Sequence, residues 1–455
     1  MKNICFVSNF YKTYFFEEIA NGLRESGINI YWICFSEKMY QHLSSDFKND
    51  SILLLNKSVI NKSAKPIDDF KLNELIYGDR FLRYQQDWAF DYLTSIQSPV
   101  YEFIKKNDIR FVFGEITHSY EILISRIAKR KKGLNCDYLH PQSVRIPHKR
   151  FFFLDDEFQY GIYKDNAIQN NNWEKEWKPI KAQKPRRVKQ VDKEVEKEIS
   201  IGGKLSRVKR LFTKENIEYD HPSVIAKDWI RSKHAVKEEL NKLNYKRVKP
   251  SDISDIEGKK FVLYTLHMQP EASVDVVGAY YNDQFEIINR IWRMLPPDWY
   301  LVIKEHSNAI GNRTLDFFKE FSKLRNTIIL DEKINSHLLI EKAQCIFSIS
   351  GTVAYEAALK KVPAFTFGDI FFNRLQHCHK VTYEDFRKSD NLAQLIKKKE
   401  KANAHKMTIE EFSKFIYKVS YRGIVDAPID SEDWLDPAVI KETMISFNTF
   451  IDHFY

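Results

Sequence analysis

The chain lacks the features that mark membrane-spanning, secreted and disulfide-rich proteins. Its 455 residues contain no apolar run of the roughly 18 residues that a membrane-spanning helix needs. The N-terminus, MKNICFVSNFY, enters a strand-like pattern without the profile of a signal peptide. The five cysteines are scattered without Cys-x-x-Cys spacing, which argues against a disulfide framework and against a zinc site. We therefore expect a soluble, cytoplasmic protein with reduced cysteines.

Motifs for cofactors, metals and nucleic acids are also missing. No Gly-x-Gly-x-x-Gly follows the first predicted strand, so a dinucleotide-binding fingerprint is absent. No Asp-x-Asp pair follows any predicted strand, which leaves a divalent metal that holds a diphosphate without obvious ligands. The basic stretches lack accompanying base-stacking aromatic residues and a recognisable nucleic-acid-binding module. We predict no metal, no cofactor and no nucleic-acid partner.

The composition that is present is globular and basic. Hydrophobic residues make up 43% of the chain and aromatic residues 14%, which excludes a fully disordered protein. A chain of this length is expected to form two domains of ordinary size. The formal net charge of +9 suggests acidic partners, namely nucleotides, anionic sugars or the negative leaflet of a membrane.

Strand and helix patterns alternate in both halves of the chain. Apolar strands at 3–8 and 28–34 flank a helix pattern at 14–23, and the same alternation returns clearly from residue 258 onward. This order predicts an α/β fold with parallel, doubly wound sheets. The predicted units are a first Rossmann-like domain (1–159), a charged helical insertion (160–250), a second Rossmann-like domain (251–380) and C-terminal helices that pack back across the domains (381–455).

The insertion differs from its surroundings in charge. Lys, Arg and Glu dominate it, with charge pairs at helical spacing. Its basic runs at 184–189 and 204–210 could contact an anionic lipid or polymer. Solvated helix faces explain such runs more often.

Candidate residues of the first domain follow its later strands. Glu115 comes directly after the strand predicted at 109–113, and ligands of parallel sheets bind at the carboxyl edge of the strands. A helix-capping carboxylate would look similar, so both readings stay open. Asp155 and Asp156 follow a polar cluster at 140–150. Basic groups beside a substrate carboxylate would explain that cluster, and a solvated loop is the simpler account.

The second domain carries polar side chains after three of its predicted strands. Parallel strands present their carboxyl ends at one edge, so these loops should converge. Together they supply cations, imidazoles and the start of a helix, which predicts an anion site. The residues are His267, Gln269 and Glu271 in the first loop, Lys304, His306 and Arg313 in the second, and Ser350, Gly351 and Thr352 in the third.

The third loop opens a helix in the stretch Cys345 to Asp369. The unpaired amides and positive dipole end of a helix N-terminus can hold a phosphate, although Ser350 or Thr352 could simply cap the helix. Glu356 lies one turn further on the same face. Because metal ligands for a diphosphate are missing, a nucleoside monophosphate leaving group fits better. This favours a CMP-activated sugar acid over a UDP- or GDP-sugar.

Three segments resemble the capsule polysaccharide biosynthesis family of KpsS/KpsC-like proteins. They are LYTLHMQPEAS (263–273), LVIKEHSNAIGNR (301–313) and ISGTVAYEAALKKVPAFTFGD (349–369), with weaker similarity at FGEITHSYE (113–121) and near 140–157. The Lys-Glu-His element is also similar to the His-Pro motif of bacterial sialyltransferases, except that Ser307 stands where proline is usual.

The resemblance implies a GT-B architecture, with two Rossmann-type domains facing across a cleft, and a retaining transferase of Kdo or pseudaminic acid from a CMP donor. It implies that Ser350, Gly351, Thr352, Lys304, His306 and Arg313 bind the donor, with Glu356 near the ribose or cytosine and His267, Gln269 and Glu271 at the sugar. The catalytic carboxylate is then sought across the cleft, first at Glu115 and next at Asp155 or Asp156. His267 would assist or transiently accept the sugar.

Other functions fit the same sequence. The leading hypothesis is transfer of pseudaminic acid, legionaminic acid or Kdo to a capsule or surface-glycan acceptor. A UDP-sugar transferase or epimerase on the same fold is a second enzyme reading. A non-catalytic capsule-assembly or polysaccharide-binding protein is a third. A basic chain with aromatic anchors could also contact the inner membrane, where lipid-linked acceptors reside.

Overall fold

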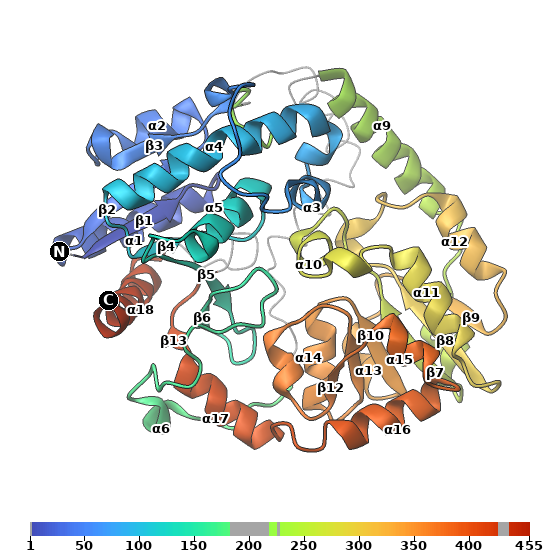
Figure 1. The fold of residues 1–455 in the computed structure, drawn as a ribbon. Coiled ribbons are helices and arrows are strands. Elements are labelled where there is room, and N and C mark those ends of the chain that lie inside the picture. Colours follow the sequence, from blue (N-terminus) through green and yellow to red (C-terminus); the bar gives the residue numbers. More distant parts are fainter. Residues whose placement is uncertain (1, 183–217, 225–227, 426–435) are drawn as a thin grey trace.

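The computed structural model describes residues 2–182, 218–224, 228–425 and 436–455. They form two α/β domains that lie side by side, with the N-terminal domain at the left of Figure 1 and the second domain at the right. The fold predicted from the strand and helix patterns, two Rossmann-like domains with parallel sheets, is confirmed.

The first domain is built on a seven-stranded sheet with the order β13-β6-β5-β4-β1-β2-β3. Strands β5 to β3 in this order are parallel, whereas β6 is antiparallel to β5 and β13 to β6. The strands are β1 (Asn3–Val7), β2 (Asn29–Cys34), β3 (Ile52–Leu54), β4 (Phe111–Phe113), β5 (Asp137–Ser143), β6 (Arg150–Leu154) and β13 (Tyr421–Arg422).

Helices pack on both faces of this sheet. Successive side chains of each strand point to opposite faces, so each face contributes to a hydrophobic core of its own. Ile4 and Phe6 of β1 face one core, and Cys5 and Val7 face the other. The first core is closed by helices α1 and α18, and the second by α3, α4 and α5. The helices are α1 (Lys12–Glu25), α2 (Glu37–Leu43), α3 (Leu72–Gly78), α4 (Gln86–Lys106), α5 (Ser119–Arg130) and α18 (Pro437–Phe454).

The second domain has a six-stranded, fully parallel sheet with the order β12-β11-β10-β7-β8-β9. Its strands are β7 (Lys260–Thr265), β8 (Trp299–Lys304), β9 (Thr327–Leu330), β10 (Cys345–Ser348), β11 (Ala364–Thr366) and β12 (Cys378–Lys380). Its helices are α10 (Ala272–Asp275), α11 (Gln284–Arg293), α12 (Leu315–Ser322), α13 (Ser336–Ile340), α14 (Thr352–Leu359), α15 (Tyr383–Arg387) and α16 (Leu392–Ala402).

The C-terminal part of the chain contributes elements to both domains. Leu392 and Leu395 of α16 belong to the core of the second domain, so this domain continues beyond residue 380. Helix α17 (Ile409–Val419) then leads back, and β13 and α18 complete the first domain. In Figure 1 the red helix α18 accordingly lies beside the N-terminal strands.

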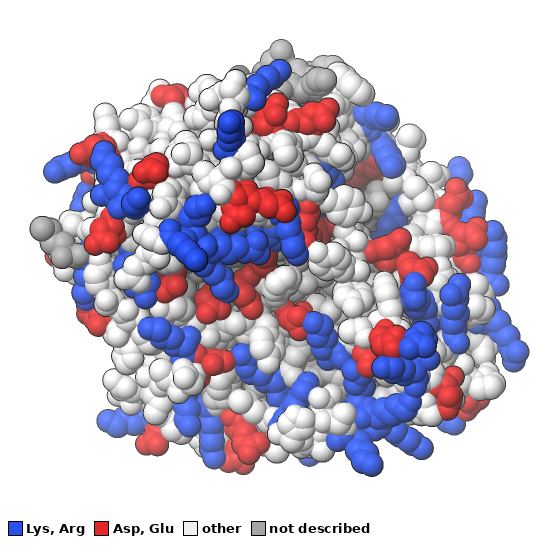
Figure 2. All heavy atoms as spheres, in the orientation of Figure 1, with Lys and Arg blue, Asp and Glu red and all other residues white. Residues whose placement is uncertain are grey.

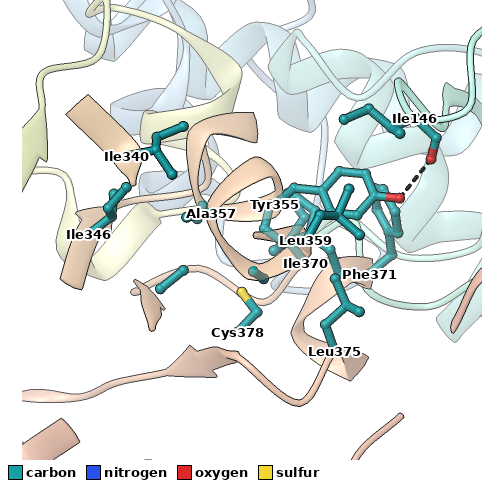
Figure 3. Packing of buried hydrophobic residues seen from close by; sticks show 14 of the residues in the cluster. Ile146, Ile340, Ile346, Tyr355, Ala357, Leu359, Ile370, Phe371, Leu375 and Cys378 are labelled. Atoms are coloured by element: carbon teal, nitrogen blue, oxygen red, sulfur yellow. Dashed lines mark hydrogen bonds between the residues drawn. The ribbon is translucent and has the colours of Figure 1, made fainter. Parts of the chain in front are cut away.

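Hydrophobic residues of the two domains pack together in a shared cluster. Figure 3 shows Tyr355 and Phe371 of the second domain packed towards Ile146 of the first. The Tyr355 hydroxyl donates a hydrogen bond of 2.6 Å to the carbonyl oxygen of Ile146. A second link joins Arg83 of the first domain to Asp275 of the second, with 3.2 Å between Nη2 and Oδ2. These contacts fix how the two sheet edges face each other.

The region 160–250, predicted as a helical insertion, is helical only in part where it is described. It contains α6 (Trp173–Glu176) and α9 (Asp228–Tyr245), while 218–224 is an irregular segment on the first domain. The basic runs at 184–189 and 204–210 lie outside the described residues. Within the described ranges, no helix combines the length and apolar character needed to cross a bilayer.

Candidate active site

A large cavity lies between the carboxyl edges of the two sheets. Its volume is about 940 Å³, and residues of both domains line it. In each domain the strand order reverses at the first strand, between β1 and β4 and between β7 and β10. Ligands of doubly wound sheets bind at such switch points. Glu115 follows β4, and His267 and Gly351 follow β7 and β10, so the two switch points supply opposite walls of one cavity.

The turn between β10 and α14 forms the tightest part of the second wall. Ser348 Oγ accepts a hydrogen bond from the Gly351 amide at 3.0 Å and lies 2.9 Å from His267 Nε2. A Cβ atom at Gly351 would approach Ser348 Oγ to 2.6 Å, so only glycine fits without movement. In the first turn of α14, the amides of Thr352 and Val353 lack intrahelical acceptors and lie at the cavity.

His267 holds this turn in place. The Ile349 amide donates a hydrogen bond of 3.0 Å to His267 Nε2, so this nitrogen carries no proton. Burial, together with the nearby His306 and Arg313, lowers the pKa of His267 to about 3. The ring is therefore neutral, with its proton on Nδ1. Because Nε2 is occupied by the turn, His267 fits a supporting role better than the predicted role of accepting the sugar.

Lys304 and His306 come from the end of β8 and line the same wall. Lys304 Nζ donates a hydrogen bond of 2.8 Å to the carbonyl oxygen of Glu332. His306 Nδ1 accepts one from the Asn308 amide at 3.2 Å, which leaves Nε2 as the protonated nitrogen of the neutral ring. Both side chains line the cavity together with the first residues of α14.

A buried ion pair supports the Lys304 loop from behind. Arg313 Nη1 donates to both oxygens of Glu305, at 2.6 and 2.8 Å, and Nη2 donates to the carbonyl oxygen of His267. Burial raises the pKa of Glu305, against the lowering effect of Arg313. Arg313 thus ties two loops of the second domain together and does not line the cavity.

Glu356 lies on the cavity-facing side of α14 and pairs with another helix. Its Oε2 atom is 2.9 Å from Nδ1 of His337, which follows the start of α13. Burial raises the pKa of Glu356 to about 7, while Lys360 acts in the opposite direction. Ser350 Oγ donates to the carbonyl oxygen of Ser273 at 2.7 Å, so its hydroxyl proton is used within the protein.

Glu115 on the opposite wall is held in a network of buried polar groups. Asn9, which follows β1, donates from Nδ2 to Glu115 Oε2 at 3.1 Å and to Glu121 Oε1 at 3.0 Å. Lys12 Nζ lies 3.7 Å from the other oxygen of Glu115. Glu121 also accepts the amides of Thr117 and His118, each at 2.9 Å. Burial, and then the charge of Glu115, raise the pKa of Glu121 to about 8.

His140 and several basic side chains surround Glu115 at the cavity. His140 Nδ1 lies 3.3 Å from the carbonyl oxygen of Gly114, and Nε2 lies 3.0 Å from Gln142 Oε1. Burial lowers the pKa of His140, and the charge of Glu115 partly offsets this. A neutral imidazole at this wall can accept a proton. The basic side chains that line the first-domain wall are Arg80, Arg145, His148 and Lys149.

Most of the predicted site residues meet at the cavity, and four do not. The lining contains Glu115, His267, Glu271, Lys304, His306, Ser350, Gly351, Thr352 and Glu356. Gln269 lies behind it, where its amide donates to Asp275 Oδ1 at 3.0 Å. Arg313 also does not line the cavity and pairs with Glu305. Asp155 and Asp156 lie outside the cavity.

Asp156 has a structural function at its position. Its two carboxylate oxygens accept the amides of Phe158, Tyr160 and Gly161 at 3.2, 3.2 and 2.7 Å, which fixes the turn after β6. Asp155 is partly buried, and burial raises its pKa. Because β6 runs antiparallel to β5, its end points away from the edge that carries Glu115. The structure therefore does not support these two carboxylates as catalytic groups.

The sequence interpretation missed Asn9, Lys12, Glu121 and Glu305 as parts of the site. Asn9 could have been found, because it follows β1 as Glu115 follows β4, and the two strands are neighbours. Glu305 sits between Lys304 and His306, is buried and pairs with Arg313. Among the described residues, no group of three or more His, Cys, Asp or Glu side chains converges to hold a metal ion.

Two Rossmann-like domains that face each other across a cavity define a GT-B-like fold, as predicted. Residues 184–409 match the sequence model of the family described as "Capsule polysaccharide biosynthesis protein". This match, over just under half of the chain, confirms the predicted resemblance to the family. No curated protein sequence matches the chain.

Several solved structures match the chain at low sequence identity and low TM-score. KpsC of Thermosulfurimonas dismutans, a beta Kdo 2,7 transferase, is 13% identical over 77% of this chain and 88% of its own, with a TM-score of 0.36. A glycosyltransferase from Rickettsia africae is 14% identical over 98% of both chains, with a TM-score of 0.28. UDP-GlcNAc 2-epimerase of Methanocaldococcus jannaschii is 12% identical over 92% of this chain and 98% of its own, with a TM-score of 0.28.

Proposed function

We propose that the protein is a retaining, metal-independent glycosyltransferase. It transfers a 3-deoxy ulosonic acid, such as pseudaminic acid, legionaminic acid or Kdo, from a CMP donor to a capsule or surface-glycan acceptor. The proposed setting is cytoplasmic, with an acceptor that is lipid-linked at the inner membrane. The match to the model of the capsule polysaccharide biosynthesis family supports a transferase.

One observation carries this proposal: the chemistry of the two cavity walls is complementary. The second-domain wall offers the amides of Thr352 and Val353 with Lys304 and His306, a set that suits a single phosphate. The first-domain wall offers Glu115, held by Asn9. A leaving phosphate and an attacking carboxylate belong on opposite faces of the anomeric carbon.

In the proposed first step, a Glu115 oxygen attacks the anomeric carbon as the bond to the CMP phosphate breaks. The phosphate leaves with the bonding electrons, and the amides of α14 with Lys304 and His306 stabilise its charge. In the second step, the acceptor hydroxyl displaces Glu115 and gives its proton to a neighbouring base. His140 is suited to that role because it is buried and neutral. Two inversions give retention.

A donor assay tests the proposal directly. The purified protein would be incubated with CMP-pseudaminic acid, CMP-legionaminic acid or CMP-Kdo and a glycan acceptor, and product and released CMP would be measured. Product from at least one donor is expected. Calorimetry adds the nucleotide preference, since CMP should bind and UDP should not. Absence of product and of CMP release with every donor, or binding of UDP alone, would overturn the assignment.

A further inference from the structure

Helix α9 bridges the outer edges of both domains and is attached through one face. Tyr245 packs in the core of the second domain, with its ring centroid 5.2 Å from that of Phe318. Asn241 donates a hydrogen bond of 3.0 Å to the carbonyl oxygen of Gly311. His234 lies against Tyr84 of the first domain, with the ring centroids 4.5 Å apart. In Figure 1 the helix lies at the outer rim, at the upper right.

The face opposite these attachments is apolar and exposed. Trp229 is 64% exposed, and Val236, Leu240 and Leu243 are each 54–55% exposed. Their spacings of seven, four and three residues place them on one side of a helix. An amphipathic helix usually turns its apolar side to the core, and α9 does the reverse. A surface stripe of this kind marks an interaction site.

Basic side chains flank this apolar stripe. Lys233 and Lys237 are exposed beside it, and Lys246 and Arg247 follow at the helix end. Figure 2 shows basic side chains at the corresponding edge of the molecule. The acidic Glu238 and Glu239 lie 2.6 and 3.3 Å from Lys242, which partly neutralises them. The surroundings of the stripe are thus positive.

We propose that α9 docks the protein on an anionic lipid bilayer, with Trp229, Val236, Leu240 and Leu243 entering the headgroup region. An exposed tryptophan with leucines on one side and lysines along the flank is the pattern of a helix that lies in the plane of a membrane. The positive flank matches the negative surface of a phosphatidylglycerol-rich leaflet. This inference does not depend on the proposed transferase activity.

A fluorescent label beside the stripe tests the docking. The five cysteines are all buried, so the introduced thiol of Ser232→Cys can be labelled selectively with an environment-sensitive dye. Vesicles of equal parts phosphatidylglycerol and phosphatidylcholine should shift the dye emission to shorter wavelength, and pure phosphatidylcholine should give a much smaller shift. The partition coefficient should fall as the salt concentration rises, because salt screens the lysines.

Paired variants distinguish membrane binding through the stripe from nonspecific adsorption to lipid. In the labelled protein, Leu240→Ser with Leu243→Ser should weaken partitioning roughly tenfold or more, since two apolar side chains no longer enter the bilayer. Ile445→Ser, at a side chain of α18 that is 51% exposed, should leave partitioning unchanged.

Four results would overturn the proposal. The dye emission could stay the same with anionic vesicles, or the double variant could partition like the unchanged protein. The emission could already be shifted without vesicles, which would mean that other residues of the chain cover the stripe. Light scattering could reveal a dimer that the double variant dissociates, which would assign the stripe to a second copy.

Discussion

Replacing Gly351 by alanine adds one methyl group at the tightest point of the proposed donor site. The new Cβ would lie 2.6 Å from Ser348 Oγ and 3.1 Å from His267 Cε1. The φ angle of Gly351 is −71°, which any residue can adopt. The cost therefore comes from the contact and not from backbone strain.

The structure also limits how the contact can be relieved. Ser348 Oγ is held by the Gly351 amide at 3.0 Å and by His267 Nε2 at 2.9 Å. Overpacking of such a site typically costs about 1–3 kcal/mol. If the turn opens to admit the methyl group, the first amides of α14 move away from the phosphate position. We expect the Kd for CMP to rise by roughly 10- to 100-fold and the Tm to fall.

Calorimetry on four proteins measures this effect and its cause. They are the unchanged protein, Gly351→Ala, Ser348→Ala and the double variant. Ser348→Ala removes the oxygen atom that the methyl group meets, so the double variant should bind CMP more tightly than Gly351→Ala alone. The two substitutions should therefore be non-additive. Thermal melting gives a second readout that does not require CMP to be the ligand.

Two results would refute this reasoning. Gly351→Ala could bind CMP and melt like the unchanged protein, which would mean that the turn accommodates the methyl group freely. Alternatively, Ser348→Ala could fail to relieve the loss, which would show that the contact with Ser348 is not its cause.

Three further predictions concern the carboxylates. Glu115→Gln should lower kcat at least a thousandfold, on the order of 4 kcal/mol of barrier, and leave the calorimetric Kd for CMP within about twofold. Affinity for the anionic CMP should fall as pH rises through 7, because Glu356 with its pKa of about 7 becomes ionised at the cavity, and binding isotherms of Glu356→Gln from pH 6 to 8 should show a flatter decrease. Asp156→Asn should retain kcat and KM in the donor assay, since Asp156 lies outside the cavity and its replacement keeps an acceptor oxygen for the turn.

The second domain was the more predictable half. Its strands read as apolar runs that end in polar loops, and every strand is parallel. In a parallel sheet the end of a strand alone determines the edge at which a loop lies. The positions of His267, Lys304 and Ser350 at one edge therefore followed from local pattern.

The first domain was less predictable because strand direction is not a local property. Asp155 follows a strand as clearly as Glu115 does, but β6 pairs antiparallel with β5. The two carboxylates consequently leave the sheet in opposite directions. Only the tertiary fold shows that the chain reverses after Ser143, where the loop at 144–149 reaches over to the second domain through Ile146.

Residues whose side chains support a loop of the site, without lining the cavity, were the hardest to predict. Gln269 and Arg313 stand in the predicted loops, yet their side chains point to Asp275 and Glu305 behind the cavity. A polar residue in a site loop can serve the ligand or the loop itself, and the sequence pattern is the same for both. The distinction depends on burial and on partners far apart in the chain.

The charges of the two walls differ in a way that bears on the chemistry. The wall of the second domain presents helix amides, Lys304 and His306, whereas Glu115 on the first wall sits above the buried Glu121. Burial and the charge of Glu115 raise the pKa of Glu121 to about 8, so the negative charge on this carboxyl is reduced near pH 7. The reduced charge weakens the repulsion between Glu121 and Glu115, and Glu121 also accepts the loop amides of Thr117 and His118. This arrangement favours the proposed role of Glu115 as the carboxylate that attacks the anomeric carbon.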